Sequence, residues 1–169
     1  IGMLAALAAK QKGAQVYISD IAQGKLDYAK QFGINTLLND SPEHFEQQVK
    51  KITNGDGFDV AIEAVGLPST FQNCIDAAAF GGRVVLIGVG KKNLDFNFTL
   101  LQKKELNVFG SRNALKKDFF DLIDMVRNGD VPLEKIVTNV YRFEDAATAF
   151  SEFDKNAGSM LKVVLDFTK

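Results

Sequence analysis

The sequence has little of the residue types that most metal sites and covalent active sites require. Its 169 residues include one cysteine, Cys74, and one histidine, His44. A single cysteine cannot form an internal disulfide, and Cys74 with His44 cannot by themselves provide the four ligands of a tetrahedral zinc site. Cys74 falls in a helical pattern that predicts a small buried or half-buried residue, whereas His44 falls in a polar helical pattern and is expected to face solvent. The chain also shows no persuasive Ser–His–Asp or Cys–His arrangement for nucleophilic catalysis.

An excess of one charge and a long apolar run are also missing. Lysine and arginine number 20 against 21 aspartates and glutamates, and the two signs are interspersed, so the net charge is −1. Without a basic stripe we expect no nucleic-acid partner. No stretch of about 18 apolar residues is available to cross a membrane, and no basic leader precedes an apolar segment. The composition therefore predicts a cytoplasmic protein with no membrane partner.

What the sequence does contain is an alternation of extended and helical patterns. Extended segments lie at 15–20, 36–38, 58–63 and 83–88, and helical segments lie at 3–10, 21–32, 41–53 and 69–79. Continuous apolar runs are typical of parallel strands covered on both faces, and the alternation predicts right-handed crossovers between them. The predicted fold class is therefore α/β, with a doubly wound, Rossmann-like parallel sheet.

The last third of the chain has a different pattern. Residues 94–98 alternate strictly and predict a strand with Leu94, Phe96 and Phe98 on one face. Further extended segments are predicted at 106–110, 137–143 and 161–167, and helices at 118–126 and 144–153.

The start of the chain is the most informative segment. Gly2 opens an apolar helical run that Gly13 ends, and a β-branched segment then runs to Asp20. A glycine at the mouth of a helix, the helix, a strand and an acid at its end form the second half of a βαβ dinucleotide site. The glycine permits close packing beside a pyrophosphate, and the acid accepts hydrogen bonds from an adenosine ribose. The first strand of that unit would precede Ile1, so we expect the sheet to lack its first strand within this chain.

Other residues of the same kind fall where predicted strands end. Glu63 ends one strand, Gly66 follows it, and Gly88 and Gly90 follow the next. Ligands of doubly wound sheets bind at the carboxyl ends of the strands, where glycines allow the backbone to approach a flat ligand. Each glycine alone could simply shape a turn, and Asp20 alone could be a solvated loop acid. Their joint placement favours a dinucleotide site.

With these features the chain resembles the zinc-dependent medium-chain alcohol/polyol dehydrogenase family. The resemblance is carried by an ordered series of segments at 1–5, 59–66, 81–88, 104–111, 149–150 and 162–164. The turn at 111–114 is most similar to members that act on polyols and sugar acids. The resemblance implies that residues 1–136 are an NAD-binding domain and that residues 137–169 return to the catalytic domain.

On the adenosine side, the resemblance implies roles for four residues. Gly2 would lie by the pyrophosphate, and Asp20 would bind the ribose hydroxyls. Ile21 would flank the adenine, and Lys25 would reach the same ribose. Lys25 also has a simpler interpretation as an exposed helix lysine.

On the nicotinamide side of the cofactor, the resemblance implies roles for five more residues. Val65, Ile87 and Gly88 would line the ring, whereas Ser111 and Asn113 would be backbone partners of the carboxamide.

Two basic residues complete the implied cofactor site. Arg112 and Lys162 would supply positive charge near the phosphates, and each has a simpler interpretation as a surface charge.

The resemblance also implies the chemistry. The whole enzyme would transfer a hydride between NAD and a secondary alcohol such as a polyol or sugar acid. Zinc would be held only in a catalytic domain that has no counterpart in these residues. The chain alone is therefore expected to be inactive.

Two other classes stay open from the residues alone. A Rossmann-like methyltransferase also places an acid at the end of its second strand to hold a ribose. Its sheet normally finishes with an antiparallel hairpin, whereas the residues after Gly90 offer one alternating strand. A non-catalytic NAD-binding module would equally lack catalytic residues.

The predicted strand at 94–98 also bears on assembly. An exposed apolar edge strand promotes aggregation unless it is paired or covered. We expect a homodimer in which this strand pairs antiparallel with its copy across a twofold axis. The alternative is that a helix of the same chain covers Phe96 and Phe98.

Overall fold

The computed structural model describes residues 1–129 and 131–168, and it confirms the α/β class. The helices are α1 (Gly2–Gln11), α2 (Gln23–Lys30), α3 (Pro42–Ile52), α4 (Pro68–Ala77), α5 (Thr99–Lys103), α6 (Lys116–Arg127) and α7 (Ala146–Lys155). The strands are β1 (Tyr17–Asp20), β2 (Asn35–Leu38), β3 (Phe58–Glu63), β4 (Ala78–Leu86), β5 (Asn107–Gly110), β6 (Val137–Arg142) and β7 (Lys162–Asp166). Short 3-10 turns at Leu133–Lys135 and Phe143–Asp145 precede β6 and α7.

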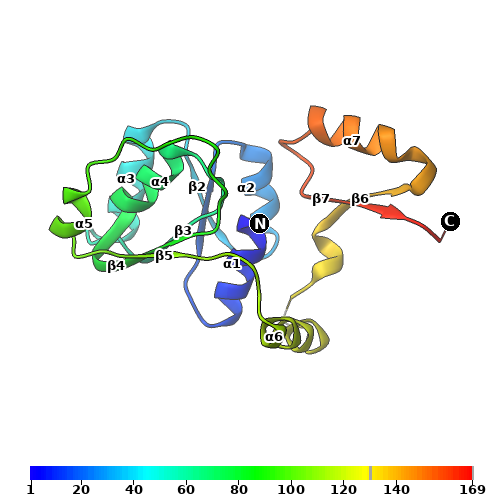
Figure 1. Ribbon diagram of the computed structural model, residues 1–169, viewed down its shortest axis with the longest axis horizontal. Helices are drawn as coiled ribbons and strands as arrows, with labels where there is room; N and C mark the ends of the chain where they lie inside the picture. The colour runs from blue at the N-terminus through cyan, green and yellow to red at the C-terminus, as the bar shows by residue number, and fades with distance from the viewer. Residues whose placement is uncertain (130, 169) are drawn as a thin grey trace.

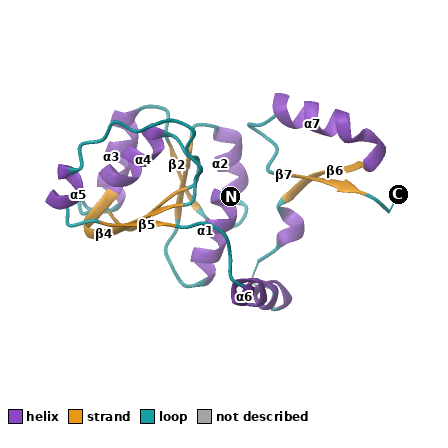
Figure 2. Cartoon of the chain, in the orientation of Figure 1, coloured by secondary structure: helices purple, strands orange, loops and turns teal. Residues whose placement is uncertain are grey.

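The strands form three separate parallel sheets (Figures 1 and 2). β1 pairs with β2, β4 lies between β3 and β5, and β6 pairs with β7. Within the described residues, no strand is hydrogen-bonded between β1 and β3, where the first strand of a doubly wound sheet belongs.

Three apolar clusters hold the helices against the first two sheets. A first core, around Leu7, joins α1 and α2 to β1, and a second, around Phe45, joins α3 to β2 and to the end of α4. In the third core, α4 and α5 cover one face of the central sheet, and Val84 has no exposed surface. Val131 and Ile136 belong to the first core, so the chain leaving α6 is attached to α1 and α2 before it enters β6.

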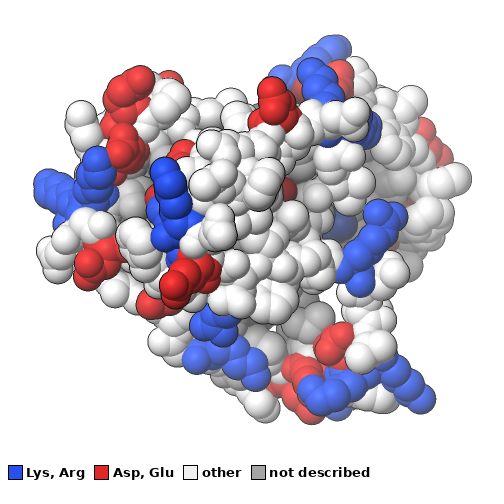
Figure 3. Space-filling view, turned by 60° about the vertical axis from the view of Figure 1, so that its left-hand side comes forward, with Lys and Arg blue, Asp and Glu red and all other residues white. Residues whose placement is uncertain are grey.

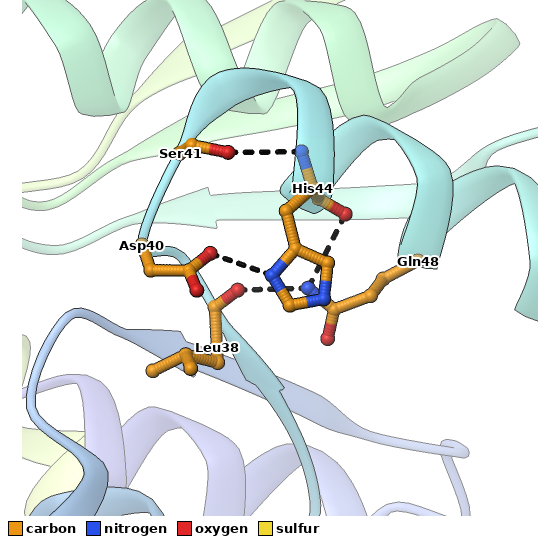
Figure 4. Close-up of polar contacts among 5 residues, drawn as sticks. All are labelled: Leu38, Asp40, Ser41, His44 and Gln48. Atoms are coloured by element: carbon orange, nitrogen blue, oxygen red, sulfur yellow. Dashed lines mark hydrogen bonds and ion pairs between the residues drawn. The ribbon is translucent and has the colours of Figure 1, made fainter.

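The turn between β2 and α3 is held by a helix cap (Figure 4). The His44 amide donates to Ser41 Oγ at 3.1 Å, and the imidazole Nδ1 lies 2.6 Å from Asp40 Oδ1. Gln48 Nε2 donates to the Leu38 carbonyl at 2.7 Å. The hydrogen bond from His44 lowers the pKa of the Asp40 carboxyl. The His44 side chain is 46% exposed, which confirms that it faces solvent as part of a structural cap.

The carboxyl end of α4 is held by a lysine from far along the sequence. Lys104 Nζ donates to the carbonyls of Ile75, Asp76 and Ala78 at 2.9, 2.8 and 2.9 Å. Such carbonyls have no partner within a helix, and a cation there also complements the helix dipole. Partial burial lowers the pKa of Lys104. This contact fixes α4 to the segment that leads into β5.

The predicted strand at 94–98 is wrong. These residues run as an irregular segment into α5, a helix that the sequence pattern did not reveal. Phe96 packs inward against Phe71 of α4, edge to face, with ring centroids 5.0 Å apart. The alternative interpretation therefore holds for Phe96, because its own chain covers it. It fails for Phe98, which is 74% exposed.

A second boundary also differs from the prediction. The helix predicted at 69–79 ends at Ala77, and the strand predicted at 83–88 begins earlier, at Ala78, so that Gly81 and Gly82 lie inside β4. A Cβ on Gly82 would come within 2.8 Å of the Ala79 carbonyl oxygen, so the strand bends tightly there. The glycines therefore allow the first residues of β4 to bend, which is consistent with the register shift between β3 and β4.

The surface carries both signs of charge without a single-sign field on the face that Figure 3 shows. Exposed pairs one helical turn apart, such as Lys50 with Glu46 at 2.6 Å, contribute to this mixture. Among the described residues, no helix is long and apolar enough to cross a membrane.

Candidate functional site

The carboxyl ends of β3, β4 and β5 lie level with one another. The register pairs Glu63 with Leu86 and Leu86 with Gly110. The segments that leave these strands, 64–66, 87–90 and 111–113, therefore emerge at one edge of the central sheet. This is the edge at which doubly wound sheets bind their ligands.

A cavity of about 500 Å³ opens between the segments that follow β4 and β5. Its lining includes four of the predicted site residues, Ile87, Gly88, Ser111 and Arg112. The Ser111 amide donates to the Leu86 carbonyl at 2.8 Å, which ties the two segments together below the cavity. The structure thus brings together most of the residues expected on the nicotinamide side.

Gly2 and Val65 lie where this edge begins, at the end of β3. A Cβ built on Gly2 would stand 3.8 Å from Ala64 Cβ, so the amino end of α1 lies beside the segment that follows β3. Val65, the next residue, is 62% exposed. Because β3 is the neighbour of β4, Val65 lies on the β3 side of the cavity that opens after β4 and β5.

The predicted adenosine side is built on a different sheet. Asp20 ends β1 half-buried, and its Oδ1 accepts a hydrogen bond from the Ala22 amide at 2.9 Å. Its second oxygen accepts no hydrogen bond from the described residues. Ile21 is 79% exposed, and Lys25 lies half-buried in the first turns of α2.

Two of the predicted residues lie apart from these groups. Asn113 is exposed beyond Ser111 and has a φ of 64°, in the left-handed region that asparagine tolerates. Lys162 is exposed at the start of β7, whose sheet with β6 is separate from the central sheet (Figure 1). No hydrogen bond or ion pair joins either side chain to the other predicted site residues that the structure describes.

The residue that the sequence prediction left without a role is Glu63. Only 4% of it is exposed, and its Oε1 accepts hydrogen bonds from three donors. These are the amides of Val65 and Gly66, both at 2.8 Å, and the Thr70 hydroxyl at 2.7 Å. An acid at the end of an otherwise apolar strand was the available signal, but the pattern could not show that it is buried.

Glycines allow the segments around Glu63 to touch. A Cβ on Gly88 would stand 2.3 Å from Glu63 Oε2 and 2.3 Å from the Gly66 nitrogen. Gly66 has a φ of 88°, and its Cβ would stand 2.6 Å from the Val89 carbonyl carbon. The sequence prediction assigned these glycines to ligand approach. The structure shows that they are also needed for the two loops to approach each other.

Cys74 lies in α4, close enough to Glu63 for that charge to affect its thiol. Burial raises the pKa of its thiol to about 12, and the negative charge of Glu63 contributes in the same direction. Such a thiol is a poor nucleophile and a poor metal ligand near neutral pH. Among the described residues, no group of three or more His, Cys, Asp or Glu side chains is arranged to hold a metal ion.

Comparison with known proteins identifies the family. Residues 1–128 match the family described as zinc-binding dehydrogenase. The chain belongs to the zinc-binding dehydrogenase family. This confirms the resemblance that the strand-end motifs indicated.

Named relatives extend the match along the chain. The chain is 34% identical over 163 residues to an uncharacterised zinc-type alcohol dehydrogenase-like protein of Haemophilus influenzae, covering 96% of this chain and 47% of that protein. It is 29% identical over 171 residues to D-xylulose reductase of Saccharomyces cerevisiae, covering 98% of this chain and 48% of that protein. The chain therefore spans about half the length of the curated relatives that it matches.

Solved structures of dehydrogenases share the fold. Benzyl alcohol dehydrogenase from Acinetobacter calcoaceticus matches with a TM-score of 0.85 at 26% identity, over 97% of this chain and 46% of that chain. A short chain alcohol dehydrogenase from Escherichia coli, complexed with NADH, matches with a TM-score of 0.87 at 25% identity, over 99% of this chain and 49% of that chain.

Proposed function

We propose that this chain is the cofactor-binding half of an oxidoreductase that transfers a hydride between NAD and a secondary alcohol. The observation that carries the proposal is that the amino end of α1 lies beside the segment that follows β3, at the edge where the cavity at Ile87 and Gly88 opens. Asp20 ends β1 in a separate sheet and supplies the strand-end acid. The match to an NADH-complexed dehydrogenase structure supports NAD as the cofactor.

Each group of residues has a distinct task in this proposal. Asp20 accepts hydrogen bonds from the adenosine ribose through its open oxygen, and its charge disfavours a 2′-phosphate. Gly2 leaves room for the pyrophosphate beside the amino end of α1, whose unpaired amides favour anions. Ile87, Gly88 and the backbone at Ser111 hold the nicotinamide and exclude water from one side of it. When bound, NAD supplies the hydride acceptor.

The remaining predicted residues complete the cofactor site. Ile21 flanks the adenine, Lys25 reaches the ribose, Val65 lies beside the cofactor, and Asn113 presents its backbone to the carboxamide. Arg112 and Lys162 add positive charge toward the phosphates. For Lys162 this requires the C-terminal segment, residues 137–169, to approach the edge as part of the catalytic domain.

The substrate and the metal belong to the rest of the enzyme in this proposal. Relatives named D-xylulose reductase and L-galactonate-5-dehydrogenase support a polyol or sugar acid as substrate. The described residues offer no group of side chains arranged to hold zinc, and the ligands of the metal are expected in the other half of the enzyme. The chain alone is then expected to bind NAD and to be inactive. The family match disfavours a methyltransferase, and a non-catalytic NAD-binding module is the second candidate, because no catalytic role is proposed for any of the described residues.

We also propose that the enzyme works in the cytoplasm as a homodimer formed through residues 94–98. Because Phe96 is packed inside its own chain, the exposed Phe98 is the contact that a partner would use. Phe98→Lys should shift sedimentation toward the monomer without lowering the melting temperature. An unchanged sedimentation coefficient at low protein concentration would remove this interface.

The test of the proposed activity uses the full-length protein with a panel of polyols and sugar acids. NAD-linked oxidation of at least one of them is expected, with NAD preferred over NADP by about tenfold to a thousandfold. Comparable efficiency with NADP would contradict the role of Asp20. Cofactor binding without turnover of any alcohol would favour the non-catalytic module.

A further inference from the structure

Glu63 is an ionisable group at a place where ionisable groups are costly. It is 4% exposed and follows the apolar segment 60–62 of β3. Removing a carboxylate from water is unfavourable unless hydrogen bonds replace the lost solvation. The amides of Val65 and Gly66 and the Thr70 hydroxyl provide this replacement at a single oxygen, Oε1.

Through its side chain and its carbonyl, Glu63 holds two neighbouring loops at once. Its side chain fixes the start of the loop that follows β3. Its main-chain carbonyl accepts hydrogen bonds from the amides of Ile87 and Gly88, at 2.8 and 3.0 Å, in the loop that follows β4. Its other carboxylate oxygen lies against Gly88, where no Cβ could fit. The relative position of the two loops is therefore set around one residue.

The loop after β4 is also a wall between two cavities. Leu86, Gly88 and Gly90 line the cavity of about 500 Å³ on the Ser111 side. The same three residues line a smaller cavity, of about 170 Å³, on the α4 side, and Glu63 lines that smaller cavity. Glu63 thus contacts the loop after β4 on the side opposite to the one against which the nicotinamide is proposed to lie.

We infer that Glu63 is a positioning residue for the nicotinamide half of the cofactor, acting through the backbone at Val65–Gly66 and Ile87–Gly88. This inference rests on the proposed function. The adenosine half of the site is structurally separate from Glu63, because Asp20 lies on the β1–β2 sheet and shares no hydrogen bond with Glu63. Loss of the carboxylate should therefore disturb the nicotinamide end and leave the adenosine end as it is.

The test compares NADH with ADP-ribose, which lacks the nicotinamide, by calorimetry on the full-length protein. Glu63→Gln keeps the size of the side chain and removes its charge. It is expected to weaken NADH binding by about tenfold, the equivalent of one charge-assisted hydrogen bond, and to leave ADP-ribose binding within about twofold. Thr70→Val removes one of the three donors and should give a smaller change of the same kind.

Thr53→Val is the matched control at the opposite end of β3. It removes two hydrogen bonds, one to the Val49 carbonyl at 2.8 Å and one from the Gly57 amide at 3.0 Å. It should lower the melting temperature without changing the ratio of the two affinities. If Glu63→Gln changes both affinities equally, or neither, Glu63 is not a positioning residue. If the unaltered protein does not bind ADP-ribose, the proposed function itself fails.

Discussion

The ends of β1 and β3 carry the same feature, an acid that closes a parallel strand, in opposite surroundings. Asp20 is half-buried and uses one oxygen for the Ala22 amide, which leaves the other open. Glu63 is buried, accepts three hydrogen bonds at one oxygen and touches Gly88 with the other. One acid keeps an oxygen without a hydrogen-bond partner among the described residues, and the other uses both oxygens in contacts with the neighbouring loops. Burial, which the local sequence does not reveal, decides between the two roles.

The largest expected effect tests whether the Glu63 region is closed. The pKa of Cys74 is raised from 9.0 to about 12, so the thiolate at pH 8 should be about a thousandfold scarcer than in an ordinary thiol. Alkylation by iodoacetamide should be correspondingly slow and should accelerate about tenfold per pH unit, since only the thiolate reacts. If Cys74 in the folded protein is alkylated as fast as in the urea-unfolded protein, the region around Cys74 and Glu63 is open to solvent.

Gly88→Ala tests the close contact between the loop after β3 and the loop after β4. Its Cβ would stand 2.3 Å from both Glu63 Oε2 and the Gly66 nitrogen, so the backbone must move. We expect a loss of about 3 kcal/mol in the free energy of unfolding, measured by urea denaturation, together with weaker NADH binding. Gly158→Ala is the control, because a Cβ there meets nothing within 4 Å. Equal stability of the two variants would contradict the close contact at Gly88.

Asp20→Asn tests the open acid. Removing the charge should increase kcat/KM with NADP relative to NAD by about tenfold or more, because repulsion of the 2′-phosphate is lost. Asp27→Asn is a suitable control, since Asp27 is an exposed acid of α2 paired with Lys30. Both variants should melt within a few degrees of the unaltered protein. An unchanged cofactor ratio in Asp20→Asn would mean that this acid does not contact the ribose.

Lys104→Met has the smallest expected effect on the site and separates stability from binding. It removes the three hydrogen bonds that hold the carboxyl end of α4, at a cost of about 2 kcal/mol in the free energy of unfolding. NADH affinity measured below the melting transition should stay the same. Lys103→Met, at the neighbouring exposed position, should change neither quantity. A loss of affinity in Lys104→Met alone would link the cofactor edge to general stability.

Much of the fold was predictable because its signals are local. The apolar run of β4, the cap at Ser41 and the acid at the end of β1 each depend on residues close together in sequence. The error at 94–98 has a non-local cause. Strict alternation predicts a strand, but Phe96 gains more by packing against Phe71, some 25 positions earlier in the chain.

The candidate site divides in the same way. Local pattern identified Asp20 and Gly88 as strand-end residues, and the register then placed the segments after β3, β4 and β5 at one edge. The role of Glu63 escaped prediction, because its three donors and its contact with Gly88 appear only when two loops are brought together.

By itself the sequence determined the α/β class, the order of helices and strands, and the family motifs at the strand ends, because these follow from periodicity and from residues a few positions apart. Only the tertiary structure decided which strand-end acid is open and which is buried, that Phe96 is covered, and that Lys104 holds α4. Each of these depends on which atoms the fold brings within a few ångströms of one another, and on how much water it leaves around them.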